Sequence, residues 1–217
     1  MDFITSIFKF FLELLAHPDK VISAFVANYG NWVYGFLFLI IFVETGLVIM
    51  PFLPGDSLLF LVGAFASQKI FNLWFSITLL FIAAVLGDTL NYMIGKKLGP
   101  VVFEKNYRFV KREHLLKAQA FYEKHGAKAI ILARFVPIVR TFAPFIAGVA
   151  NMNYSKFISY NLIGGAIWII GITLLGFFMG EIPYIKNNFE KVVLIIVFVS
   201  ILPIIIEFFK SRFSKKA

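Results

Sequence analysis

Residues 129–150 read AIILARFVPIVRTFAPFIAGVA, an apolar stretch that contains two arginines and two prolines. A second apolar stretch, residues 32–66, contains the acids Glu44 and Asp56. A charged side chain at the centre of a membrane helix costs roughly 2.5–3.5 kcal/mol on insertion scales, so four of them left in lipid would cost on the order of 10 kcal/mol. These charges must therefore be paired, hydrated or directed into a cavity.

The composition is that of an integral membrane protein. The chain is 60% hydrophobic and 15% charged, with a mean hydropathy of +0.85, whereas soluble domains average about 45–50% apolar and about 25% charged residues. The 217 residues suit a single membrane domain, 1–217, and leave no room for a second soluble domain with its own core. The chain has no cysteine, which excludes disulfides and zinc–thiolate sites.

The formal net charge of +9 raises nucleic-acid binding as an alternative. The basic residues flank the apolar segments, as expected for loops that face anionic cytoplasmic lipid, so we expect no nucleic-acid partner. Charged residues interrupt the N-terminal region and no small-residue cleavage site follows, so this region does not have the pattern of a cleavable signal peptide.

Proline breaks both charged apolar stretches. Residues 32–66 exceed the roughly 20 residues that one span needs but are too few for two spans, and their middle, MPFLPGD at 50–56, contains two prolines. Proline ends or kinks a helix, and non-helical backbone at membrane depth survives only where protein or water covers it. We therefore predict a re-entrant hairpin at 32–66 and a second one at 129–150, which Pro137 and Pro144 interrupt.

The remaining segments complete an all-α, polytopic membrane fold. Apolar residues recur at helical spacing near the N-terminus, with charges on the other side, as in a helix lying in the membrane interface. The predicted segments are an interfacial amphipathic helix at 3–16, a transmembrane helix at 72–94, a cytoplasmic loop at 96–128, and transmembrane helices at 157–179 and 192–209.

The distribution of basic residues predicts how the segments cross the membrane. The loop 96–128 and the C-terminal tail both carry an excess of Lys and Arg, which places both in the cytoplasm. Two crossings, 157–179 and 192–209, already connect them, so residues 129–150 must enter and leave on the cytoplasmic side. Residues 32–66 then dip from the external side. Hairpins that enter from opposite faces are typical of inverted-repeat transporters. The placement of the N-terminal helix stays open.

Arg134 and Arg140 are the candidate substrate-binding residues. On an unbroken helix they would point about 240° apart, but a break at Pro137 lets both guanidinium groups converge on one anion. Guanidinium is always charged and binds phosphate with two parallel hydrogen bonds. The alternative is structural, with each arginine pairing a carboxylate to hold a hairpin in place.

Glu44 and Asp56 flank the proline-containing tip of the first hairpin and are the candidate proton-coupling residues. Desolvation and a nearby arginine shift the proton affinity of such a carboxylate in opposite directions. Those opposing effects can bring its titration into the range that a proton gradient uses. The alternative is a fixed ion pair with an arginine.

Asp88 and Asn91 lie one helical turn apart on 72–94 and are possible supporting residues. Packing or capping explains them at least as well as ligand binding, since polar residues beside glycines join membrane helices. Gly164, Gly165 and Trp168 read as packing and interfacial anchoring residues.

The chain lacks the residue patterns of the common enzyme sites. His17, His114 and His125 have no partner at metal-ligand spacing, and no serine lies in a nucleophile-elbow pattern. No glycine-rich phosphate loop is present. We therefore predict a protein that is not an enzyme and that has neither a cofactor nor a metal site.

Several motifs, in order, resemble the DedA family of bacterial membrane proteins, which is related to the SNARE-associated (VTT-domain) lipid scramblases of eukaryotes. They are Phe42-Val43-Glu44, Pro51 to Asp56, Gly87-Asp88 with Asn91-Tyr92 and Gly95, Phe121 to Gly126, Arg134 to Arg140, and Ala147-Gly148. The resemblance covers roughly residues 30–180, although Asp56 is glutamate in many relatives. It implies an inner-membrane location, opposed re-entrant hairpins, proton-dependent transport or return of undecaprenyl phosphate, and functional roles for Glu44, Asp56, Arg134 and Arg140.

From these residues we expect a proton-coupled transporter or flippase for a lipid phosphate, such as a polyprenyl phosphate or a phospholipid head group. Arg134 and Arg140 would bind the phosphate, and Glu44 and Asp56 would pair with them when the site is empty. Two alternatives stay open: a proton-coupled transporter of a small ion or osmolyte, and a non-transporting membrane scaffold or assembly factor. Homo-oligomerisation also stays open.

Overall fold

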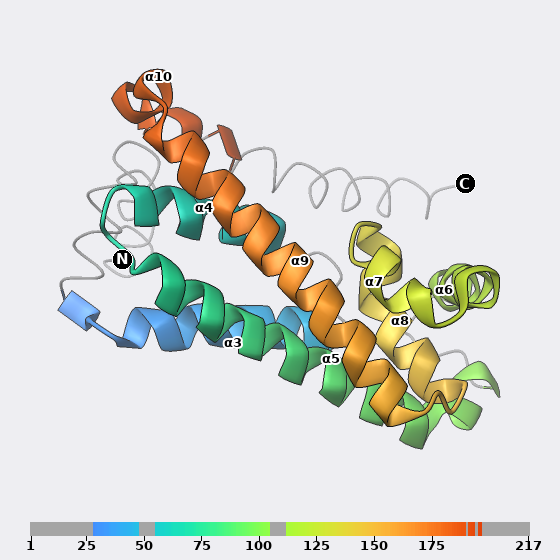
Figure 1. Cartoon of the computed structure of the whole chain (residues 1–217). Helices are drawn as coiled ribbons and strands as arrows, with labels where there is room; N and C mark the ends of the chain where they lie inside the picture. Colours follow the sequence, from blue (N-terminus) through green and yellow to red (C-terminus); the bar gives the residue numbers. More distant parts are fainter. Residues whose placement is uncertain (1–27, 48–54, 105–111, 190, 194, 197–217) are drawn as a thin grey trace, which may run out of the picture. The chain divides into compact units, whose positions relative to one another are not determined.

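The computed structural model describes residues 28–47, 55–104, 112–189, 191–193 and 195–196. All regular structure within these ranges is helical (Figure 1). The predicted interfacial helix at 3–16, and most of the predicted span at 192–209, lie outside the described residues. The elements are α3 (Trp32–Gly46), α4 (Gly55–Ser67), α5 (Leu73–Glu104), α6 (Arg112–His125), η1 (Gly126–Lys128), α7 (Ala129–Ala133), α8 (Pro137–Val149), α9 (Tyr154–Glu181) and α10 (Pro183–Asn187).

Two of the described helices are long and apolar enough to cross a membrane. They are α5 over Leu73–Leu98, with 26 residues, and α9, with 28 residues. At a rise of about 1.5 Å per residue, either exceeds the roughly 30 Å of a bilayer's hydrocarbon core. The all-helical fold with membrane-type helices agrees with the sequence prediction. Re-entry of residues 32–66 and 129–150 from opposite faces stays a prediction.

Each of the two charged apolar stretches contains two helices. Residues 32–66 form α3 and most of α4, and residues 129–150 form α7 and α8. Pro137 is at the first helical position of α8, and the preceding Val136 is extended, with φ −118° and ψ 105°. Proline is favourable at this position, where its missing N–H is not needed, and it disfavours helical geometry for the residue before it. Pro144 lies inside α8 without ending it.

The connection predicted at 96–128 is largely helical. Helix α5 continues to Glu104 rather than ending at Ile94, and α6 follows from Arg112 to His125. The positive charges at Lys96 and Lys97 suggested a helix end, but a helix can extend beyond the apolar segment when its last turns are hydrated.

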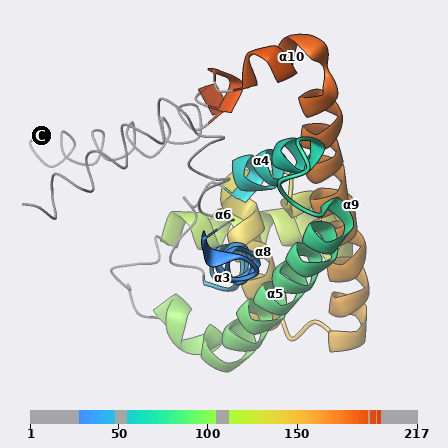
Figure 2. The ribbon, with the colours of Figure 1, turned by 90° about the vertical axis from the view of Figure 1, so that its left-hand side faces the viewer.

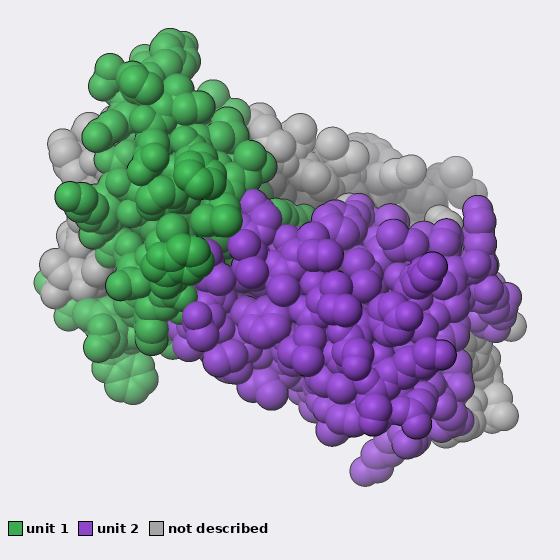
Figure 3. Space-filling model, viewed as in Figure 1, with its two compact units in different colours: residues 1–35, 56–76, 172–217 green, residues 36–55, 77–171 purple. Residues whose placement is uncertain are grey.

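The chain divides into two compact units (Figure 3). Unit 1 comprises residues 1–35, 56–76 and 172–217, and unit 2 comprises residues 36–55 and 77–171. Helices α3, α5 and α9 each contribute residues to both units. In unit 2, α5 and α9 run antiparallel: Tyr92 stacks on Phe157 at 4.4 Å between ring centroids, and Asn161 Nδ2 donates to the Val85 carbonyl at 3.2 Å. Both helices can be followed in Figure 2.

The two units contain the same kind of helix pair. In unit 2, a Cβ on Gly95 of α5 would collide with the Phe145 carbonyl of α8, and a Cβ on Gly148 with the Tyr92 carbonyl. In unit 1, a Cβ on Gly176 of α9 would collide with the Phe60 carbonyl of α4, and a Cβ on Gly63 with the Thr173 carbonyl.

The spacing is identical in both pairs. In α4 and in α8 the glycine follows the phenylalanine by three positions, and in α5 and α9 the glycine follows the contacted carbonyl by three positions. Small residues at such contacts let backbones approach closely, which is a main source of helix association in membranes. The shared pattern supports an internal repeat in which α8 corresponds to α4 and α5 corresponds to α9.

We expect Gly176→Ala to destabilise the protein, although alanine favours helix over glycine by about 1 kcal/mol. The new methyl group would meet the backbone of Phe60, which cannot move aside, and overpacking typically costs about 1–3 kcal/mol. Gly171→Ala on the same helix is the matched control, because its Cβ would meet nothing within 4 Å. Thermal unfolding in detergent should lower the midpoint for Gly176→Ala and not for Gly171→Ala. Equal midpoints would contradict the close contact.

Candidate functional site

The break between α7 and α8 positions two arginines. Arg134 follows the last residue of α7, and Arg140 lies in the first turn of α8, on either side of the extended Val136. The chain changes direction at this break, and both guanidinium groups lie close to the indole ring of Trp168. The Cζ atoms of Arg134 and Arg140 lie 5.5 Å and 5.3 Å from the ring centroid of Trp168 on α9. Cations within about 6 Å of an aromatic face are attracted by its quadrupole.

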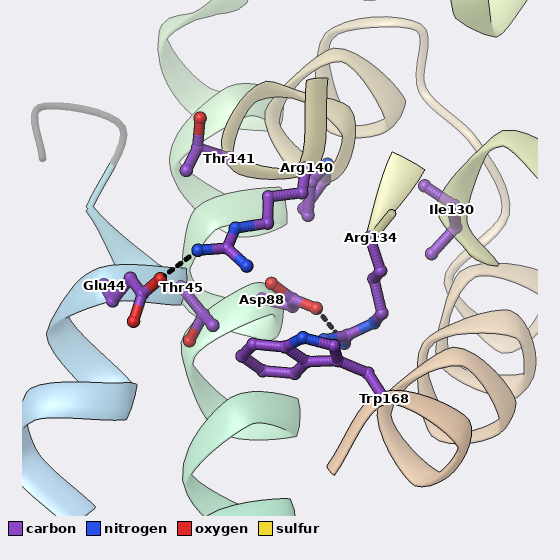
Figure 4. A pocket seen from close by; sticks show the side chains of 9 residues that line it. Glu44, Thr45, Asp88, Ile130, Arg134, Arg140, Thr141 and Trp168 are labelled. Carbon is purple, nitrogen blue, oxygen red and sulfur yellow. Dashed lines mark hydrogen bonds and ion pairs between the residues drawn. The ribbon is translucent and has the colours of Figure 1, made fainter. Parts of the chain in front are cut away.

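Each arginine forms an ion pair with its own carboxylate (Figure 4). Arg134 Nη2 donates to Asp88 Oδ2 on α5, and Arg140 Nη2 donates to Glu44 Oε1 in the last turn of α3. The Arg134 and Asp88 side chains are each 6% exposed, whereas those of Arg140 and Glu44 are 12% and 1% exposed. Pairing is required here, since an isolated charge at such burial would cost several kcal/mol.

Neutral side chains complete the surroundings of the two ion pairs. Asn161 Oδ1 of α9 accepts from Arg134 Nη2 at 2.6 Å. Asn91 Nδ2 donates to the Thr45 carbonyl at 3.1 Å and to the Thr141 carbonyl at 2.8 Å. Thr45 and Thr141 directly follow Glu44 and Arg140 in the chain. Asn91 therefore holds the backbone on both sides of the Glu44–Arg140 pair.

Glycines give the charged side chains the space that they occupy. A Cβ on Gly55, the first residue of α4, would overlap the Glu44 carboxylate. A Cβ on Gly164 of α9 would lie 3.2 Å from Cδ and Nε of Arg134. On α5, a Cβ on Gly87 would collide with Thr45 Oγ1. A side chain at Gly55 or Gly87 would force a neighbouring side chain to shift, and one at Gly164 would leave a tight contact with Arg134.

The four charged groups and Trp168 line one cavity within unit 2. Its other lining residues are Thr45, Ile130, Thr141 and Pro144. The cavity has a volume of about 10 Å³, which is room for roughly one water molecule. Two carboxylates and two guanidinium groups give the lining a formal charge of zero. In this conformation, each carboxylate accepts a hydrogen bond from Nη2 of its arginine, a donor that an anionic ligand could otherwise use.

The structure brings together most of the predicted site residues. Glu44, Asp88, Arg134 and Arg140 line the cavity, and Asn91 lies beside it. Asp56 belongs to unit 1 and is exposed in the first turn of α4. Arg134 pairs with Asp88, whereas the sequence suggested Asp56 as the second acid to pair with an arginine. The proton-coupling role of Asp56 stays a prediction.

Two site residues were not recognised from the sequence. Trp168 was interpreted as an interfacial anchor, yet it is 2% exposed and contacts both arginines, and Asn161 was not considered. A signal was present, because Asn161, Gly164, Gly165 and Trp168 follow the spacing of one helix face. Within the described ranges, no group of three or more His, Asp or Glu side chains could hold a metal ion.

Comparison with known proteins confirms the family resemblance. A VTT domain profile matches residues 53–178. The chain is 48% identical to protein DedA of Escherichia coli strain K12 over 206 residues, 94% of either chain. It is 46% identical to an uncharacterized membrane protein of Mycobacterium leprae, over 77% of this chain and 75% of that one. It is 34% identical to the inner membrane protein YqjA of Escherichia coli strain K12, over 79% and 74%. No solved structure shows a significant match.

The apolar helices and the named relatives together define a helical membrane protein. The chain belongs to the VTT-domain family, the DedA family of membrane proteins. The relative from Mycobacterium leprae and YqjA are named as membrane proteins, and none of the three names describes an enzyme.

Proposed function

We propose that the protein carries a lipid phosphate, such as a polyprenyl phosphate or a phospholipid head group, across the bacterial inner membrane. Arg134 and Arg140 bind the phosphate, and proton movement accompanies the translocation. The observation that carries the proposal is the pair of buried guanidinium groups that converge on Trp168, each neutralised by one carboxylate. The protein acts as a transporter rather than an enzyme, with its C-terminus in the cytoplasm.

The chemistry of the two arginines favours phosphate. A guanidinium group keeps its charge in an apolar site and presents several donors in a plane, which matches the oxygen atoms of a phosphate. Two such groups on one indole form a compact cationic surface. Arg134 Nε is buried and makes no hydrogen bond to any described residue, so at least one donor remains available for a ligand oxygen.

The surroundings of Arg134 favour a ligand with a lipid tail. Leu132, Phe135 and Val136, close to Arg134 in sequence, are exposed apolar residues at the α7–α8 break. In a membrane, such residues contact acyl chains. A lipid could therefore keep its tail in the bilayer while its head group reaches the arginines, whereas a small soluble ion would gain nothing from this surface.

Protonation of the acids provides the coupling. The sequence predicts Glu44 and Asp56 as proton-coupling residues. Glu44 lines the cavity, and its ion pair with Arg140 gives its protonation a direct effect, whereas the role of Asp56 stays a prediction. A neutral Glu44 no longer holds the guanidinium electrostatically, so Arg140 becomes free to bind phosphate. Return of the carboxylate charge releases the phosphate by competition.

Reconstituted proteoliposomes test this function. Vesicles contain a polyprenyl phosphate in both leaflets, and a phosphatase added outside hydrolyses only the accessible head groups. Active protein should allow nearly complete hydrolysis, faster when a pH gradient is imposed, whereas protein-free vesicles should stop at the outer leaflet. Hydrolysis that stops at the outer leaflet with folded protein present would contradict lipid translocation. A parallel flux assay with small anions and osmolytes tests the second transporter class, and absence of every flux would leave the scaffold role.

A further inference from the structure

The charge balance of the cavity limits how an anion can bind there. The charged groups that line it are Glu44 from α3, Asp88 from α5, Arg134 at the end of α7 and Arg140 from α8. Helix α9 contributes Trp168 and Asn161, which are uncharged. The described lining is therefore neutral as a whole. A phosphate that entered without a compensating change would give a buried site a net negative charge, which is costly at low dielectric constant.

We propose that Asp88 is a proton acceptor of this site together with Glu44, and that the number of protons taken up on binding equals the negative charge of the bound phosphate. A dianionic phosphate monoester would bind with two protons and a monoanionic diester with one. This inference rests on the phosphate-binding function proposed above and specifies its coupling.

The geometry assigns the protons to the two carboxylates. Arg134 and Arg140 cannot lose their protons in a protein, so the arginines cannot restore neutrality. Asp88 forms an ion pair with Arg134, and Glu44 forms one with Arg140. Each acid must release its arginine before that arginine can bind phosphate fully. A carboxylate only accepts hydrogen bonds, whereas a protonated carboxyl group also donates one. Protonation therefore changes both acids from competitors of the phosphate into possible partners.

The uncharged residues of α9 make this exchange feasible. Asn161 Oδ1 holds Arg134 at 2.6 Å independently of Asp88, and Trp168 contacts both guanidinium groups. These cation–π contacts persist when the acids are neutral. Both arginines can thus keep their positions while their counter-ions change from carboxylate to phosphate.

Two ligands with one tail but different charge test the proposal. Farnesyl phosphate is a monoester that is mostly dianionic at about pH 7.5, since its second pKa is near 6, and farnesyl methyl phosphate is a monoanionic diester. Binding to the purified full-length protein is measured by calorimetry in buffers of different ionisation enthalpy, which gives the number of protons exchanged. The wild-type protein should take up about two protons with the monoester and about one with the diester.

Single variants assign the protons to residues. Asp88→Asn and Glu44→Gln should each lower the proton uptake by about one proton for either ligand, because each substitution removes one carboxylate that can accept a proton. Glu123→Gln, at an exposed position on α6, is the matched control and should keep the wild-type uptake. If Asp88→Asn does not fold, the Glu44→Gln protein still tests the assignment. It should take up about one proton when it binds the monoester.

The outcomes separate this inference from the function on which it rests. Binding without proton uptake, equal uptake for both ligands, or wild-type uptake in a folded Asp88→Asn protein would overturn the inference and leave phosphate binding intact. Failure of both ligands to bind would overturn the proposed function itself.

Discussion

Replacing Asp88 with alanine should destabilise the folded protein by about 3–5 kcal/mol, the usual effect of removing one partner of a buried ion pair. Arg134 would keep its charge beside the neutral Asn161 and Trp168, with the Arg140 guanidinium over the same indole ring. Unfolding in detergent, followed by temperature or denaturant, measures the loss. The exposed Glu123→Ala should change stability by less than about 0.5 kcal/mol.

A double variant separates the loss of the ion pair from other effects of the substitution. Asp88→Ala with Arg134→Met removes both charges and leaves an apolar pair, which is often neutral or stabilising in a buried position. Stability should therefore recover toward that of the wild type, while phosphate binding should not. If the double variant is as unstable as Asp88→Ala alone, an unpaired Arg134 is not the cause of the loss.

Replacing Arg140 with alanine should lower lipid-phosphate translocation by roughly 30-fold to 5,000-fold, which corresponds to the about 2–5 kcal/mol that truncating a buried, hydrogen-bonded charge costs in binding. The substitution also leaves the Glu44 carboxylate, 1% exposed, facing the phosphate. Arg140→Lys should recover only part of the rate, because an ammonium group lacks the planar set of donors of guanidinium. The proteoliposome assay described above measures the rates.

The same experiment needs a variant that preserves folding. Glu44→Gln with Arg140→Gln removes both charges of the pair and can restore a hydrogen bond between two amides. We expect this protein to fold with near wild-type stability and to remain inactive. A folded double variant that transports lipid phosphate at the wild-type rate would show that Arg140 serves the structure alone.

The position of the two arginines could be predicted from the sequence because it depends on local chemistry. A proline midway between Arg134 and Arg140 favours a break in the helix, and the extended conformation observed at Val136 agrees with the restricted conformation of a residue before proline. The need for counter-charges followed from the cost of burying the arginines. The two arginines of the site could therefore be predicted from local sequence.

Glu44 was predicted as a partner of an arginine, whereas Asp88 was not, since such pairing depends on which helix faces meet. Asp88 was placed close to a helix end because Lys96 and Lys97 follow the apolar segment. In the structure, α5 continues to Glu104, so Asp88 lies well inside the helix and faces Arg134. Trp168 was equally ambiguous, since tryptophan is common at membrane interfaces and its burial beside two arginines results from tertiary packing.

The repeat was only partly visible in the sequence. The prolines of residues 32–66 and 129–150 and the distribution of basic residues predicted two hairpins that enter from opposite faces, as in inverted-repeat transporters. The structure adds the reciprocal glycine contacts of α8 with α5 and of α4 with α9. Such contacts join segments far apart in the chain, and a pattern of small residues alone does not identify the partner helix.

The central claim is that Arg134 and Arg140 hold one phosphate together beside Trp168. Solid-state NMR in lipid bilayers can test it by measuring dipolar coupling between the phosphorus of bound farnesyl phosphate and the 15N-labelled arginine side chains. Comparison with Arg134→Lys and Arg140→Lys assigns the signals. We predict that guanidinium nitrogens of both residues lie about 4 Å from the phosphorus, as charge-assisted hydrogen bonds require. Phosphorus coupled to neither arginine in a protein that still transports the lipid would contradict the account.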